Sequence, residues 1–62
     1  MAISPKAARV HANLTQKEAA EKLGISRTTL QNYETMKSIP SIDVAKKMAN
    51  LYGFTVDEIN FF

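Results

Sequence analysis

Apolar side chains recur at helical spacing along most of this chain, and no segment alternates between apolar and polar residues with a period of two. Ser4 and Pro5 mark a first helix start, because a hydroxyl N-cap precedes proline at the first helical position. Thr15 opens a second helix and forms a T-x-x-E capping box with Glu18. Gly24 is expected to end this helix, since glycine readily takes the left-handed conformation found after helix C-termini.

Three further helices are predicted in the rest of the chain. Ser26 caps the third, which runs to about Glu34, and Ser41 caps the fourth, which a glycine ends. A second capping box then introduces a short last helix over residues 56–62. We therefore expect residues 1–62 to form one all-α domain of five short helices.

The third helix is predicted to have two different faces. At about 100° per residue, Leu30 and Tyr33 point toward the core. The outward face carries Thr28, Gln31 and Asn32, with Arg27 at its edge near the N-terminus and no acidic side chain among them. Arginine pairs with guanine, asparagine pairs with adenine, and threonine offers a hydroxyl or a methyl group, so this face suits the DNA major groove. A solvated face that happens to be polar is the alternative.

Charge adds modest support, because the net charge of +2 is unevenly distributed. Residues 1–40 carry six of the eight basic side chains and three of the six acidic ones. Gln16, at the start of the second helix, brings a side-chain amide, a free backbone N–H and the positive end of the helix dipole together, which suits a phosphate. An ordinary solvated surface would explain the same charges.

Several classes of protein are not expected. The chain has no cysteine and a single histidine, His11, so neither disulfides nor a metal site is predicted. It has no phosphate-binding glycine loop and no Ser-His-acid spacing, so we expect no enzyme, cofactor or small-molecule ligand. No apolar run approaches the roughly 20 residues of a membrane span, and the N-terminus lacks a secretory signal. A soluble, intracellular protein is the expectation.

The run from Gln16 to Glu34 resembles the helix-turn-helix of phage repressor and Cro proteins, a family that includes the xenobiotic-response-element type bacterial regulators. It has the pattern Q-x-x-x-A-x-x-x-G-I-S-x-x-x-L-x-x-Y-E. The resemblance covers roughly residues 5–62, including a K-x-x-P loop at residues 37–40 and the segment GFTVDEIN. It implies a five-helix lambda-repressor-like domain whose second and third helices form the helix-turn-helix.

The resemblance also implies a function and residue roles. The protein would be a phage- or prophage-type transcriptional repressor that binds a double-stranded DNA operator, with a homodimer through the C-terminal helix as one expectation. Arg9 would pair with Glu34. The implied base-reading residues are Arg27, Thr28 and Asn32. The implied DNA-backbone contacts are Gln16, Ser26, Thr29, Gln31 and Lys37.

Two points limit the resemblance. Thr35 and Met36 stand where the family usually has Asn-Gly or Arg-Gly, and a left-handed residue other than glycine costs about 1 kcal/mol or more. We therefore expect the chain to leave the third helix differently, which bears on any phosphate contact by Lys37. A protein-binding module, like an antitoxin or anti-repressor, is the alternative function.

Phe61 and Phe62 are adjacent, so at least one is expected to be exposed or to meet another chain.

Overall fold

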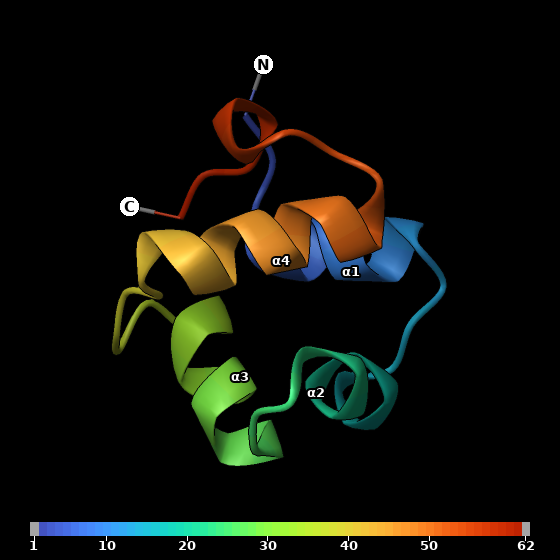
Figure 1. The fold of residues 1–62 in the computed structure, drawn as a ribbon, viewed down its shortest axis with the longest axis vertical. Helices are drawn as coiled ribbons and strands as arrows, with labels where there is room; N and C mark the ends of the chain where they lie inside the picture. The colour runs from blue at the N-terminus through green and yellow to red at the C-terminus, as the bar shows by residue number, and fades with distance from the viewer. Residues whose placement is uncertain (1, 62) are drawn as a thin grey trace.

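Four α-helices and one 3-10 turn make up the part of the chain that the computed structural model describes, residues 2–61. They are α1 (Pro5–His11), α2 (Gln16–Leu23), α3 (Arg27–Glu34), α4 (Ile42–Tyr52) and the 3-10 turn η1 (Val56–Glu58). α1 packs against α4 at one end of the molecule, and α2 and α3 form the other end (Figure 1). The expected all-α class is confirmed.

Each α-helix begins at a hydroxyl side chain that accepts a hydrogen bond from a backbone N–H three residues later, as local capping patterns predict. The caps are Ser4, Thr15, Ser26 and Ser41. The capping box of α2 is complete, with Thr15 N–H donating to Glu18 Oε1 at 3.0 Å and Glu18 N–H donating to Thr15 Oγ1 at 3.1 Å. Hydrogen bonding to Thr15, above all to its backbone N–H, holds the pKa of the Glu18 carboxyl below its usual value.

The core lies where the four helices meet, and it combines small with large apolar side chains. Leu30 of α3 and Met48 of α4 are completely buried. Ala8, Ala19 and Ala45 are also fully buried, and their short side chains let the helix backbones come close together. This packing fixes α3 from its inner side, so the outer side of the helix is held in place without using its polar residues.

The last predicted helix is wrong in extent. Instead of a helix over residues 56–62, only η1 forms, and Ile59 is extended with φ −108° and ψ 130°. Ile59 makes an isolated parallel bridge with Ile3. Ile3 N–H donates to the carbonyl of Glu58 at 2.9 Å, and Asn60 N–H donates to the carbonyl of Ile3 at 2.7 Å. These bonds to the N-terminal segment replace the bonds that a longer helix would make within itself.

The bridge also bears on the burial of the C-terminal aromatic side chains. Phe61 is 1% exposed and is among the largest fully buried side chains, while Phe54 is half-buried. Phe61 N–H donates to the carbonyl of Ile59 at 3.1 Å, and the side chains of Ile59 and Phe61 both belong to the core. The expectation of an exposed phenylalanine therefore rests on Phe62, which lies outside the described residues.

The exit from α3 differs from the sequence expectation as well. Met36 takes the left-handed conformation, with φ 63°, in place of the usual glycine. Lys37 N–H donates to the carbonyl of Asn32 at 2.9 Å, and Met36 N–H donates to that of Tyr33 at 3.4 Å. This is the Schellman pattern, so the chain leaves the helix as a glycine-terminated one would. These two hydrogen bonds offset the local cost of the left-handed conformation.

Candidate nucleic-acid interface

The outer face of α3 places polar side chains in solvent. Arg27 and Thr28 are exposed in the first turn, and Gln31 is exposed one turn later. Asn32 is half-buried, so part of its side chain is available for contact. Leu30 is fully buried behind them, as the helical spacing predicts. A rigid helix thus presents hydrogen-bonding groups of the types that read base edges in a major groove.

The start of α3 is closed by two hydroxyl groups that bind each other. Ser26 Oγ accepts from Thr29 N–H at 3.0 Å and lies 2.8 Å from Thr29 Oγ1. Ser26 is exposed and Thr29 is half-buried, so this pair lies at the surface beside Arg27. The mutual hydrogen bonds order the N-terminal turn from which Arg27 and Thr28 project.

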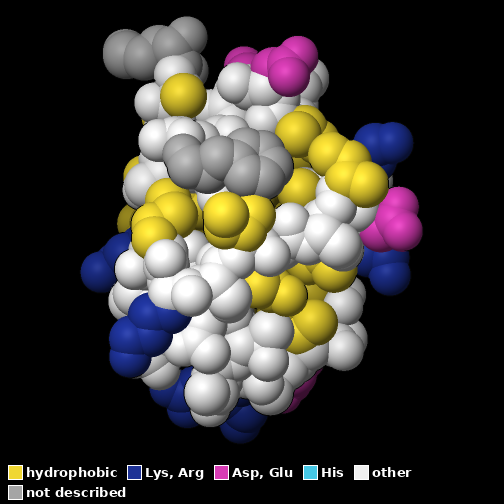
Figure 2. Space-filling model, turned by 90° about the vertical axis from the view of Figure 1, so that its left-hand side faces the viewer, with side chains coloured by type: hydrophobic (Ala, Val, Ile, Leu, Met, Phe, Trp, Pro, Cys, Tyr) yellow, Lys and Arg dark blue, Asp and Glu magenta, His cyan; other side chains and the backbone are white. Residues whose placement is uncertain are grey.

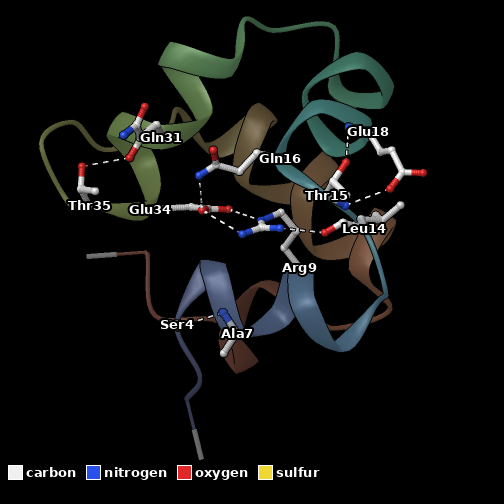
Figure 3. Close-up of polar contacts among 10 residues, drawn as sticks. All are labelled: Ser4, Ala7, Arg9, Leu14, Thr15, Gln16, Glu18, Gln31, Glu34 and Thr35. Carbon is white, nitrogen blue, oxygen red and sulfur yellow. Dashed lines mark hydrogen bonds and ion pairs between the residues drawn. The ribbon is translucent and has the colours of Figure 1, made fainter.

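Gln16, the first residue of α2, faces the end of α3 (Figure 3). Its Nε2 donates to Glu34 Oε1 at 3.0 Å, and the residue is half-buried. Among the described residues, no hydrogen bond is found for the backbone N–H of Gln16 or of Lys17, as is normal in the first turn of a helix. The beginning of α2 therefore combines two open N–H donors with an amide side chain that is already held at one point.

The structure brings Arg9 and Glu34 together beneath this site. Arg9 Nε lies 2.7 Å from Glu34 Oε2, and Arg9 Nη2 lies 3.4 Å from Glu34 Oε1. Arg9 Nη1 donates to the carbonyl of Leu14 at 2.7 Å. The side chains of Arg9 and Glu34 are only 9% and 3% exposed, so this arginine serves the interior and not a surface contact.

Lys37 is exposed just beyond α3, where the Schellman turn sets its backbone. In Figure 2, Lys and Arg side chains line the lower left edge and the base, the end of the molecule where α3 begins in Figure 1, and others lie on the right edge on either side of an acidic group. Apolar side chains gather in the middle and upper part of the same face. Basic side chains thus lie at the end that carries the polar face of α3, although not at this end alone.

Two features of this region were not expected from the sequence. The first is the hydrogen bond from Gln16 to Glu34, which joins residues 18 positions apart and follows no local pattern. The second is Tyr52, whose hydroxyl is buried without a hydrogen-bond partner among the described residues. Burial, reinforced by the charge of Glu34 and opposed by that of Arg9, raises the pKa of Tyr52 to about 12.

Other kinds of site are not found within residues 2–61. There is no pocket, and no group of three or more side chains suited to hold a metal ion. None of the described helices has the length and apolar character that a membrane crossing requires. The polar face of α3 and the start of α2 therefore carry the functional interpretation.

Comparison with known proteins gives consistent matches. A family model described as helix-turn-helix matches residues 6–59. The HTH-type transcriptional regulator ImmR of Bacillus subtilis (strain 168) is 48% identical over 52 residues, which are 84% of this chain and 41% of ImmR. An uncharacterized HTH-type transcriptional regulator of Methanocaldococcus jannaschii is 43% identical over 47 residues, covering 76% of this chain and 71% of that protein.

A phage protein is also similar. The cryptic phage CTXphi transcriptional repressor RstR of Vibrio cholerae is 31% identical over 51 residues, 82% of this chain and 46% of RstR. The chain thus spans less than half the length of ImmR and of RstR. No solved structure matches this chain significantly.

Proposed function

This chain belongs to the helix-turn-helix family, and from that premise we propose that it is a sequence-specific transcriptional regulator of the repressor type that binds double-stranded DNA. The observation that carries the proposal is the exposed start of α3, where Arg27 and Thr28 project from a turn ordered by the Ser26 cap. The repressor character follows the likeness to RstR, which is a phage transcriptional repressor. No catalytic activity is proposed, because the relatives are transcription regulators.

In the proposed mechanism, α3 enters the major groove while α2 lies across the sugar-phosphate backbone. Arg27, Thr28 and Asn32 contact base edges, with Arg27 placed to pair with a guanine. The amide of Gln16 and the open N–H donors at the start of α2 bind a phosphate, helped by the positive end of the helix dipole. The remaining backbone contacts are assigned to Ser26, Thr29, Gln31 and Lys37. Occupation of the operator would exclude polymerase, an action that takes place in the bacterial cytoplasm or nucleoid.

We further infer that two copies bind together, because one reading head this small recognises few bases. Among the described residues, the C-terminal helix expected for such a dimer is reduced to η1, but three of the four exposed large apolar side chains fall between residues 36 and 42. These three are Met36, Ile39 and Ile42. We call them the loop patch, since they follow α3 and open α4. A second copy on this patch would present two α3 helices to half-sites about 34 Å apart.

The salt dependence of binding tests the proposed function. A labelled random-sequence duplex is titrated with the protein by fluorescence anisotropy between about 50 and 200 mM salt. Because basic side chains that contact phosphates release counterions, the affinity should fall as the salt concentration rises, with a slope of log K against log salt of about −0.9 for each such contact. If no duplex binding occurs near about 0.1 M salt, the protein-binding alternative is favoured and the DNA-binding proposal fails. Selection from random sites then identifies the operator.

A further inference from the structure

Glu34 accepts three side-chain hydrogen bonds at the junction of α1, α2 and α3. Its Oε2 accepts from Arg9 Nε at 2.7 Å, and its Oε1 accepts from Gln16 Nε2 at 3.0 Å and from Arg9 Nη2 at 3.4 Å (Figure 3). With its side chain 3% exposed, Glu34 is screened from solvent. Its position at the end of α3 brings the last turn of this helix against the first residue of α2.

The charge state of Glu34 decides how the Gln16 amide is oriented. An ionised carboxylate only accepts hydrogen bonds, so the NH₂ group of Gln16, and not its carbonyl, must face Glu34. A free glutamine side chain could turn either group toward a ligand. One hydrogen of Nε2 is used by Glu34, which leaves the second hydrogen in a fixed direction, and Gln16 keeps part of its surface open to solvent.

Arg9 makes this arrangement compatible with a nearby phosphate. An unpaired carboxylate at this depth would repel an anion and would be costly to bury. Arg9 compensates the charge of Glu34 through two nitrogen atoms, and its third nitrogen is used by the carbonyl of Leu14. The carboxylate can therefore act on Gln16 as a hydrogen-bond acceptor without adding a net negative charge to the site.

We propose that Glu34 is a positioning residue for DNA binding, which holds the Gln16 amide with its NH₂ group oriented to donate to a backbone phosphate. The inference rests on the proposed function. It assigns Glu34 a role beyond the ion pair with Arg9, and it makes the phosphate contact of α2 depend on the end of α3. Any displacement of the last turn of α3 would then also weaken the binding of α2 to the DNA backbone.

A double-mutant cycle on duplex affinity tests this role, using the random-sequence duplex as the probe. Gln16→Ala should weaken binding of the wild-type protein about tenfold, as expected for a hydrogen bond to a charged group. In the Glu34→Gln background the same change should cost less than about twofold, because the amide is no longer oriented. The matched control cycle combines Gln31→Ala with Glu34→Gln. The effects of these two substitutions on duplex affinity should be additive.

A second measurement needs no variant and so does not depend on the stability of Glu34→Gln. The side-chain amide of Gln16 should show restricted motion in NMR relaxation of the free wild-type protein, whereas that of exposed Gln31 should be mobile. Equal mobility of the two amides would overturn the inference, and so would independent effects of Gln16→Ala and Glu34→Gln in a protein that binds duplex. Absence of any duplex binding by the wild type would instead overturn the proposed function on which the inference rests.

Discussion

Arg9 of α1 and Glu34 of α3 form a two-point ion pair across the interior, with 2.7 Å between Nε and Oε2. The same guanidinium donates to the carbonyl of Leu14, in the segment that leads into α2. One side chain therefore ties together the first helix, the entry to the second and the end of the third. Since both partners are almost fully buried, the pair is shielded from salt and from competing water.

Breaking this pair should be strongly destabilising. Arg9→Met leaves the carboxylate of Glu34 buried without its counter-charge, which costs about 3–5 kcal/mol. A domain of this size has little stability in reserve, so the variant should lose most of its helical circular dichroism on mild heating. The double variant Arg9→Met/Glu34→Leu should recover much of the loss, because no charge is left unpaired. A single variant as stable as wild type would contradict the account.

Met36→Gly should stabilise the protein by about 0.5–1 kcal/mol. Met36 has φ 63°, and glycine avoids the steric cost of the left-handed conformation, although it loses more entropy on folding. Met36→Ala is the matched control, because it removes the same side chain but keeps the strained backbone. Urea unfolding should rank the glycine variant above the alanine variant. The reverse order would show that this turn is not strained.

Tyr52 should make the protein sensitive to high pH. Its folded-state pKa of about 12 lies above the unfolded value of about 10, so the folded state holds this proton more tightly. The resulting stability is fully present below pH 10 and is lost as the pH rises toward 12, by roughly 2 kcal/mol. Urea unfolding at about pH 9 and about pH 11.5 measures how far the free energy of unfolding falls between these two pH values.

Two variants isolate this effect of Tyr52. Tyr52→Phe should reduce the loss at high pH and should cost little stability at neutral pH, because the buried hydroxyl has no partner among the described residues. Tyr33→Phe, at a half-buried position, is the matched control for the removal of a tyrosine hydroxyl. If Tyr52→Phe loses as much stability at high pH as Tyr33→Phe and the wild type do, Tyr52 is not the titrating group.

Arg27→Ala should weaken binding to the selected operator by about 1–3 kcal/mol and relax the base preference at one position. The side chain is exposed at the start of α3, so its removal should leave the melting temperature nearly unchanged. Lys46→Ala, an exposed position on α4, removes the same charge away from α3 and should have a smaller effect. An equal loss on operator and random DNA would contradict base reading by Arg27.

Ile42→Ser should reduce cooperative binding to a two-site operator without unfolding the protein. Ile42 belongs to the loop patch and is 55% exposed, so a polar side chain costs little in the monomer. Val10→Ser is the matched control, since Val10 is 55% exposed but lies on α1. Analytical ultracentrifugation of the protein–DNA complex reports the number of copies bound. Equal stoichiometry and cooperativity for both variants would exclude the loop patch as the dimer contact.

The features that the sequence predicted best are local ones. Helix starts at Ser4, Thr15 and Ser26 follow from a hydroxyl cap and its partner N–H three residues later, and the structure shows each of them. The inward direction of Leu30 follows equally from helical geometry. Such features need no knowledge of the rest of the chain.

The features that were missed depend on distant parts of the chain. The bridge from Ile59 to Ile3 joins the two ends, so no local pattern could favour it over a longer last helix. Met36 takes a conformation that it disfavours by itself, and only the surrounding hydrogen bonds reveal why. The contact of Gln16 with Glu34 appears only once α2 and α3 are packed, although both residues were separately singled out.

The bridge between Ile3 and Ile59 has a practical consequence for how this protein can be handled. The bridge joins the N-terminal segment to the segment after η1 in the upper part of Figure 1, whereas α3 begins at the bottom. A fluorophore, a purification tag or a fused domain attached to the N-terminal segment would therefore lie away from the start of α3, which is the part proposed to contact DNA. A label on the N-terminal segment would thus leave the polar face of α3, proposed to contact DNA, unobstructed.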